Sequence, residues 1–373
     1  MILEIKRYGD YAQKSLFRKD KLNFLILYVT SKCNLSCQTC FFHKNLNKSD
    51  DLNLSEYEKI AQSAGEFSIL GLGGGEPFLN SDLEKICTVF IDKCKINTLF
   101  IPTNGALTEI ILDKTEYLLK KFPNISISIN PSLDGMAAYH DKNRGQPGIF
   151  NQCIFIIEKL TALKKKYKNL QVIVNSVISR ENIEELKKLM EYLKQFEIDF
   201  QAFEIMRGDW RSEALNLPSL NEIKEIHKLI IKNRFWHLNK KKSKLANKLL
   251  FKLEEIAVLG VLRYSQIFKE LAIAGQSWPT ACSAGKSIAV IYPDGNFSVC
   301  ELLPPLANLK QFNYNFQKIL KNKNTRDFVK NIKQKSCGCT HICFIHSSLA
   351  RDPKSIFKIY SNYLKARNII KYD

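Results

Sequence analysis

The sequence lacks the features of a membrane or secreted protein. No run reaches the roughly 18 apolar residues that a membrane span needs. Residues 1–7 lack the basic start, apolar stretch and cleavage site of a signal peptide. The 373 residues, 45% hydrophobic and 25% charged, are typical of a globular protein with room for more than one domain. We therefore expect a cytoplasmic protein with no membrane partner.

The sequence also lacks a patch that combines Arg with aromatic residues, as nucleic-acid binding would favour. The formal charge is nevertheless +19, and Lys far outnumbers Arg. This charge is consistent with an anionic partner or with a coding sequence that simply favours Lys. The Lys runs at 164–168 and 240–244 are typical of solvated helix faces. We expect no nucleic acid among the partners.

The sequence lacks an even number of Cys residues, which a closed disulfide framework would need. The chain has 11 Cys, and most of them fall in two clusters, at 33–40 and at 282–343. In a cytoplasmic protein, clustered Cys residues indicate a metal site rather than disulfides.

The first cluster is Cys33, Cys37 and Cys40, with the spacing C-x3-C-x2-C, directly after an apolar run at 24–29. Three Cys so close together can face one point from a loop. They are one ligand short of a closed tetrahedral zinc site or of a filled four-iron cube. A cube held by three thiolates leaves one iron free for a ligand that is not protein.

Strand and helix patterns alternate six times between residues 22 and 207. We predict strands near 24–30, 68–72, 97–102, 125–130, 172–178 and 199–205, with helices between them. Ser55 with Glu58, and Ser81 with Glu84, predict caps for the first two helices. Such alternation predicts parallel strands with helices outside. Polar residues cluster where each strand stops, which is the rim that carries the chemistry in a β/α barrel.

Six units are too few for a closed eightfold barrel, so we predict an α/β fold with an open, partial (β/α)6 barrel of the TIM type. We expect four parts: a lead-in (1–21), the partial barrel (22–207), a helical bridge (208–280) and a small C-terminal domain (281–373). In the last part, 288–292 and 297–299 flank the turn residues 293–296, which predicts a hairpin.

These motifs resemble the radical S-adenosylmethionine (radical SAM) superfamily. The resemblance rests on the three Cys, on residues 74–77 (GGEP) after the second strand, on 103–105 (TNG) and on 132–135 (SLDG). It implies a [4Fe-4S] cluster on Cys33, Cys37 and Cys40 whose open iron binds S-adenosylmethionine. It further implies reductive cleavage of this cofactor to a 5′-deoxyadenosyl radical, which abstracts hydrogen from an unactivated C–H bond.

By the same resemblance, the cofactor-binding residues would be Phe41, Phe42, Gly74, Gly75, Glu76, Asn104, Ser132, Arg144 and Asn175. Backbone groups of 74–76 would meet the amino group of the cofactor, and Phe41 or Phe42 would lie near the adenine. Arg144 could pair with the carboxylate, since its fork matches that group; the alternative is a surface ion pair. For Asn175 the alternative is a strand-end hydrogen bond.

The C-terminal part resembles the SPASM/twitch extension of the superfamily, because Cys282, Gly295 and Cys300 have the spacing C-x12-G-x4-C. The resemblance implies one auxiliary [4Fe-4S] cluster. Cys282 and Cys300 are ligands, and two or three of Cys337, Cys339 and Cys343 complete the set. Zinc is the alternative metal, and His341 or His346 the alternative ligands.

Several other polar residues have two interpretations. Cys87, Cys94 and Cys153 fall in predicted helices, where a packing role competes with that of a thiol returning hydrogen to a substrate radical. His43 is interpreted as a loop residue. Residues at the end of the sixth strand could face substrate or could simply pack: Glu204, Met206 and Arg207.

We therefore expect a radical SAM enzyme that uses an electron from a reducing partner such as flavodoxin or ferredoxin. Its substrate is a small molecule, such as a sugar or nucleotide-linked metabolite, or alternatively a ribosomal peptide that is oxidised, crosslinked or epimerised. Only 21 residues precede the first strand, which favours the small molecule over a leader-bound peptide. An iron-sulfur carrier or sensor without catalysis is the alternative of a different class; the GGEP turn argues against it.

Overall fold

The structure is a computed structural model that describes residues 11, 13–14, 21–48, 50–242, 248–334 and 337–371. Most of the predicted lead-in and part of the Lys run at 240–244 lie outside these residues. In the described part, no helix is long and apolar enough to cross a membrane.

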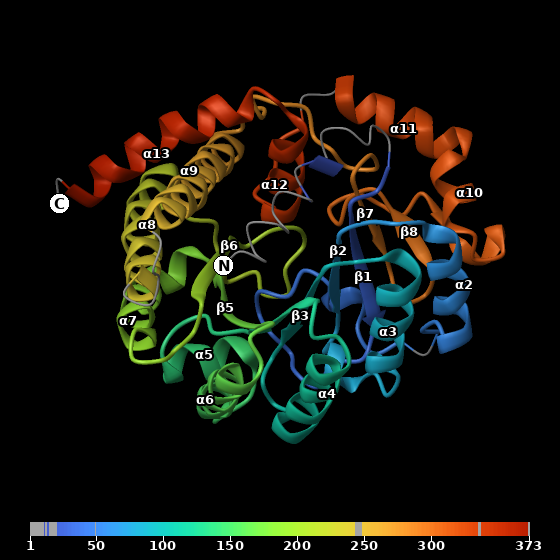
Figure 1. Cartoon of the computed structure of the whole chain (residues 1–373), viewed down its shortest axis with the longest axis horizontal. Coiled ribbons are helices and arrows are strands. Elements are labelled where there is room, and N and C mark those ends of the chain that lie inside the picture. Colours follow the sequence, from blue (N-terminus) through green and yellow to red (C-terminus); the bar gives the residue numbers. More distant parts are fainter. Residues whose placement is uncertain are drawn as a thin grey trace.

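One mixed sheet forms the centre of the molecule, with the strand order β6-β5-β4-β3-β2-β1-β7-β8-β9. Its first six strands are parallel to one another. They curve in an arc with helices on the outer side (Figure 1). The strands are β1 Phe24–Thr30, β2 Ile69–Gly74, β3 Thr98–Thr103, β4 Ser126–Pro131, β5 Leu170–Ile178 and β6 Phe200–Ile205.

The outer helices follow the strands in chain order, as βαβ units require. They are α2 Leu54–Ala64, α3 Leu83–Cys94, α4 Thr108–Lys121, α5 Ala137–Arg144, α6 Ile149–Lys166 and α7 Ile183–Leu193. All seven residues of β1 are buried, as expected for a strand covered on both faces. The predicted partial (β/α)6 barrel is confirmed, and α5 is an additional helix that the sequence analysis did not predict.

Two predicted helix caps are wrong. Helix α2 is capped by Asn53, whose side chain accepts from the Glu56 amide in a reciprocal capping box, two residues before the predicted pair. Helix α3 starts after Asp82 without a side-chain cap, and Glu84 is instead paired with Lys114. Asn is as good an N-cap as Ser, so two overlapping patterns competed for the first cap.

The bridge is helical, as predicted, with α8 Leu220–Lys242 and α9 Lys248–Ile273. The C-terminal part contains β7 Ile288–Ile291, β8 Asn296–Ser298 and β9 Ala307–Asn308, then α10 Phe316–Lys321, α11 Lys323–Gln334, α12 Ile342–Arg351 and α13 Ser355–Lys371. The predicted hairpin is β7–β8, which pair antiparallel around Gly295 at φ 85°.

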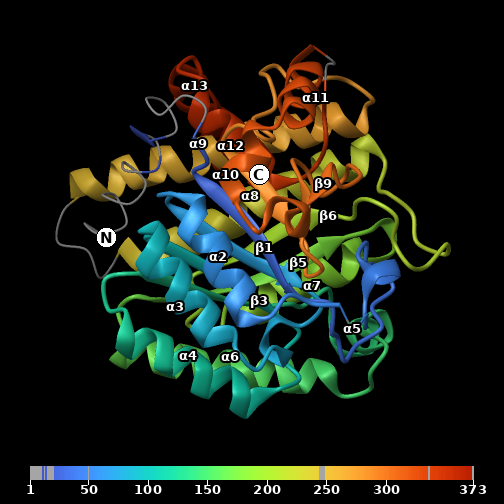
Figure 2. The same cartoon turned by 90° about the vertical axis from the view of Figure 1, so that its right-hand side faces the viewer.

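Strand β7 also pairs in parallel with β1, so the C-terminal hairpin continues the barrel sheet. Figure 1 shows β7 and β8 beside β1, and Figure 2 shows the orange C-terminal part again next to the blue strand β1. Because β1 leads into Cys33 and β8 leads into Cys300, the two Cys clusters lie on neighbouring parts of one sheet. The domain boundaries at 207, 280 and 281 stay a prediction.

Candidate functional site

The first Cys segment, residues 33–40, is a loop held from two sides. The amide of Cys33 donates to Asn47 Oδ1 (2.9 Å), and that of Gln38 donates to the Asn143 carbonyl (2.8 Å). Cys33, Cys37 and Cys40 are all half-buried and free of disulfides. The pKa of Cys33 is raised to about 11, chiefly by burial and to a smaller extent by the nearby thiols of Cys37 and Cys40. These thiols are close enough to repel one another as thiolates, and a cationic cluster would relieve that repulsion.

The Gly-rich turn, residues 73–76, packs backbone to backbone against the start of this loop. The Gly75 amide donates to the Thr30 carbonyl (2.9 Å), and the Glu76 amide donates to the Lys32 carbonyl (2.8 Å). A Cβ on Gly74 would lie 2.2 Å from the Thr30 oxygen, and one on Gly75 would lie 1.9 Å from the Lys32 oxygen. These glycines therefore allow β2 to approach the Cys loop closely.

This geometry gives a test of the turn. Gly74→Ala adds a Cβ that meets backbone, at a φ of 109°. We expect the variant to bind less iron at the first Cys segment, because the Thr30–Cys33 backbone must move. Gly148→Ala is the control, since Gly148 has a φ of 80° but open space around it; there we expect only the backbone cost of about 1–2 kcal/mol. Equal iron content in both variants would contradict this role of Gly74.

The carboxylate of Glu76 is buried and turned inward. Its Oε2 accepts from the Asn104 amide (2.7 Å), and its Oε1 accepts from the Phe78 amide (3.3 Å). Burial raises its pKa to about 7, although these hydrogen bonds lower it. Asn104 in turn donates from Nδ2 to Asn34 Oδ1 (2.8 Å), within the first Cys segment. The structure thus brings Glu76 and Asn104 together and connects both to the loop.

Arg144 forms a buried ion pair rather than the surface pair considered from sequence. Its Nη2 lies 2.7 Å from Asp134 Oδ2, and Asp134 is fully buried. Its Nη1 lies 3.7 Å from the sulfur of Cys37. The positive charge therefore faces a thiol that would ligate iron. Asp134, which sequence analysis quoted only within a motif, is also held by the Val177 amide (2.9 Å).

Removing the guanidinium should have a large effect on folding. We expect Arg144→Met to lower the free energy of unfolding by about 3–5 kcal/mol, because Asp134 would remain as a buried unpaired charge. Denaturant unfolding of the full chain measures it. Asp209→Asn breaks the exposed pair with Lys44 and should leave the midpoint unchanged. A shift as small as that of the control would show that Asp134 needs no partner.

The two aromatic candidates have different environments. Phe42 is buried, with its ring 4.9 Å from that of Tyr28 and 6.0 Å from that of Tyr292. Phe41 is partly exposed, and the Arg207 guanidinium lies 4.8 Å from its ring centre. Phe41 is therefore the more exposed of the two rings, and Arg207 lies against it.

Ser132 and Asn175 are brought together at the rim by a parallel bridge between β4 and β5. The carbonyl of Asn175 accepts from the Leu133 amide (2.9 Å), as the strand-end alternative requires. No side-chain hydrogen bond of Asn175 is found in the described residues.

Four of the five C-terminal Cys are electrostatic neighbours. The pKa of Cys339 is raised to about 12 by burial and by the thiols of Cys282 and Cys337. The pKa of Cys300 is raised by burial and by Cys339 and Cys282. For Cys343, burial again dominates, and its strongest neighbours are charged side chains, with Glu204, Glu301 and Arg207 foremost. The thiols of Cys282, Cys300, Cys337 and Cys339 therefore influence one another electrostatically, whereas Cys343 is influenced more by charged side chains.

The other Cys, His and Met residues considered from the sequence differ in their burial and contacts. Cys87, Cys94 and Cys153 are buried in α3 and α6, and the Cys153 thiol donates to the Asn104 carbonyl (2.9 Å) at the rim. His43 bonds through Nδ1 to the Cys40 carbonyl (2.9 Å), and His341 is buried against Glu301. His346 is exposed in α12, and Met206 is buried at the end of β6.

Within the described residues, no group of three His, Cys, Asp or Glu side chains has the geometry to hold a single metal ion. All of the candidate ligand thiols except the exposed Cys337 are half-buried or buried. Arg144 lies beside Cys37, and Arg207 lies beside Glu301, which follows Cys300. This donor set fits iron-sulfur clusters, whose ligands are thiolates.

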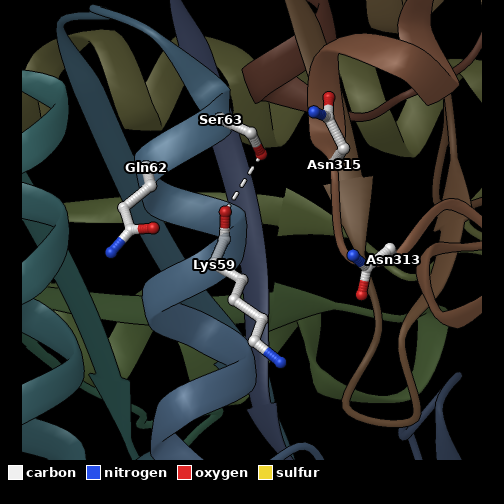
Figure 3. Close-up of a pocket in the computed structure, with 5 residues that line it drawn as sticks. All are labelled: Lys59, Gln62, Ser63, Asn313 and Asn315. Carbon is white, nitrogen blue, oxygen red and sulfur yellow. Dashed lines mark hydrogen bonds between the residues drawn. The ribbon is translucent and has the colours of Figure 1, made fainter.

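A separate polar pocket of about 410 Å³ lies between α2 and the segment before α10. Figure 3 shows Lys59, Gln62 and Ser63 on one side of it, and Asn313 and Asn315 on the other. It contains none of the Cys or predicted cofactor residues, and Ser63 is occupied by the Phe316 amide (2.8 Å). The pocket is therefore not part of the candidate site.

Residues 27–193 match the family model described as the Radical SAM superfamily. The chain is 28% identical over 195 residues to a GTP 3′,8-cyclase of Clostridium botulinum, covering 50% of this chain and 57% of that protein. It is 27% identical over 167 residues to the sporulation killing factor maturation protein SkfB of Bacillus subtilis, covering 44% and 38%. The chain thus spans 57% of the length of the first of these curated relatives and 38% of the second.

Two solved structures have a similar fold over nearly the whole chain. The first is anSMEcpe with bound AdoMet and a peptide (TM-score 0.56, 18% identity, 94% of this chain and 99% of that chain). The second is SuiB of Streptococcus suis bound to S-adenosylmethionine (TM-score 0.60, 15% identity, 93% and 78%). At such low identity the likeness concerns the fold, including the part after residue 280.

Proposed function

Residues 27–193 are a radical SAM domain. On that premise we propose that the chain is an enzyme that cleaves S-adenosylmethionine reductively. The resulting radical would abstract hydrogen from a C–H bond of the substrate. When bound, the [4Fe-4S] cluster supplies the electron for this cleavage and the open iron for the cofactor. The observation that carries the proposal is the first Cys segment packed on the Gly-rich turn, with Arg144 facing Cys37.

Different residues of the chain would have different roles in binding the cluster and the cofactor. Cys33, Cys37 and Cys40 would hold the cluster. The Gly-rich turn fixes the loop that carries them, and Glu76 with Asn104 fixes the turn. Phe41 presents its ring beside the third Cys, where an adenine could stack on it. The rim residues Ser132 and Asn175 then lie on the same carboxyl edge of the sheet.

We propose that a second [4Fe-4S] cluster is held by four thiols, those of Cys282, Cys300, Cys337 and Cys339. Cys343 would not be a ligand in this proposal, since charged side chains rather than the other thiols influence the pKa of its thiol most after burial. Such a cluster would accept an electron from the substrate radical or bind the substrate. Strand β7, which lies between Cys282 and Cys300 in the chain, pairs with β1, the strand that leads into the first Cys segment.

The proposed substrate is a small molecule, such as a sugar or nucleotide-linked metabolite. The similarity to the GTP 3′,8-cyclase, a small-molecule enzyme by its name, supports this class. Peptide maturation is the second candidate, favoured by the likeness over nearly the whole chain to anSMEcpe with a bound peptide and to SuiB. A protein reductant, such as flavodoxin or ferredoxin, would supply the electron.

The test is anaerobic reconstitution with iron and sulfide, reduction, and measurement of 5′-deoxyadenosine after S-adenosylmethionine is added. We expect slow formation without substrate. Adding nucleotide sugars, or short peptides encoded beside the gene, should speed formation for the right class only. An intact cluster that yields no 5′-deoxyadenosine would overturn the enzymatic proposal and leave the electron carrier.

A further inference from the structure

The chain after β6 lies between the two Cys clusters. Gly208, at a φ of 71°, packs closely between two side chains: a Cβ there would lie 3.2 Å from Phe41 Cβ, a tight contact, and 3.5 Å from Leu302 Cδ2. Phe41 directly follows Cys40, and Leu302 stands two residues after Cys300. One short piece of rim therefore touches the neighbours of both candidate clusters.

Arg207 extends this contact with its side chain. Its guanidinium lies 4.8 Å from the ring centre of Phe41. Its Nη2 donates to Glu301 Oε2 (3.2 Å) and lies 3.4 Å from His341 Nε2. Glu301 follows Cys300, and His341 lies between Cys339 and Cys343. A single cation thus contacts residues one or two positions after Cys40, Cys300 and Cys339.

Glu301 is the centre of this contact and is fixed from three elements. Tyr28 of β1 donates its hydroxyl to Glu301 Oε1 (2.7 Å), while Arg207 and His341 bind Oε2. The Glu301 side chain is only 5% exposed. A buried carboxylate of this kind is stable only with its cations in place.

Further charges complete the surroundings of Arg207. Glu204 Oε2 lies 3.9 Å from Arg207 and 3.8 Å from the buried Lys269. Lys269 donates to the Phe203 carbonyl (2.8 Å), which fixes it at the end of β6. Arg207 Nε is buried without a hydrogen-bond partner in the described residues. The ion pairs of Arg207 are therefore its main anchors.

We infer that Arg207 is a positioning residue for the auxiliary cluster: it fixes the Cys300 and Cys339 segments relative to the first Cys segment, and its charge stabilises the reduced cluster. Reduction adds one electron to the cluster, and Arg207 keeps its proton throughout. This inference rests on the proposed function, because it requires that the C-terminal thiols hold a cluster.

The experiment uses the full reconstituted chain and three variants. Arg207→Gln removes the charge, Arg207→Lys keeps it without the planar fork, and Asp209→Asn is an exposed control two residues away. Iron content is measured, and each cluster is titrated by its EPR signal against potential. The signal that changes on adding S-adenosylmethionine belongs to the first cluster, so the two are distinguished without turnover.

For Arg207→Gln we expect the reduced-to-oxidised ratio of the auxiliary cluster to fall about tenfold at a given potential, which is about 59 mV for one electron. Arg207→Lys should restore most of this shift, and Asp209→Asn should cause none. Selective loss of auxiliary iron in Arg207→Gln, with the first cluster intact, would also support the role.

Unchanged auxiliary potential with full iron in Arg207→Gln would overturn the inference, as would equal disturbance of both clusters. Failure of the proposed function would give a different experimental result. In that case the wild-type chain itself would lack the auxiliary signal or would form no 5′-deoxyadenosine.

Discussion

Cys37→Ala is expected to abolish formation of 5′-deoxyadenosine. Cys37 is the middle ligand of the first Cys segment and the thiol that faces Arg144. Two thiolates rarely retain a cube, and no other Cys lies in the loop to replace the third. We expect a loss of at least about a hundredfold, since even changes around the ligands of a metal site cost 10–100-fold. Product is measured after anaerobic reconstitution and reduction.

Cys87→Ala is the matched control for this variant. Cys87 is buried in α3, and burial raises the pKa of its thiol to about 12. Its loss should affect packing and leave cleavage near the wild-type level. If Cys37→Ala retained wild-type cleavage, the first Cys segment would not be the site of the chemistry.

Cys300→Ala is expected to separate the two clusters. The variant should lose the auxiliary cube, so its iron should fall from about eight to about four per chain. Cleavage of S-adenosylmethionine should remain measurable, because the first Cys segment has its own loop and its own supports. Turnover of substrate should fall strongly, since the second cluster would no longer accept an electron or bind substrate.

Cys343→Ala is the control here, because Cys343 belongs to the same C-terminal group but lies among charged side chains. We expect it to keep about eight iron atoms per chain. If Cys343→Ala lost four iron atoms and Cys339→Ala did not, the assignment of the four ligands would be wrong. Equal loss of cleavage in folded Cys300→Ala and Cys37→Ala would contradict separate roles.

Much of the barrel could be predicted because its signals are local. Each strand is a short apolar run, and each ends in polar residues that the parallel arrangement gathers at one edge. The pairing of β7 with β1 could not be predicted, because 288–291 carries the same apolar pattern whichever strand it joins. Helix α5 was missed because its sequence, AAYHDKNR, is polar and short.

At the site, residue types were predictable but partners were not. The sequence places Phe41 and Phe42 side by side, and only packing on Tyr28 and Tyr292 shows which of them is core. Tyr28 and Glu301 are 273 residues apart, so their hydrogen bond leaves no local pattern. One signal was available: Glu301 directly follows a predicted ligand, where a buried carboxylate needs a cation nearby.

The most direct test of two clusters with different roles is an EPR titration of the reduced wild-type chain with S-adenosylmethionine. We predict about eight iron atoms per chain and two signals, of which one changes on addition and the other does not. The changing signal reports the cluster with an open iron, on Cys33, Cys37 and Cys40. Two unchanged signals, or about four iron atoms with one zinc, would contradict the account.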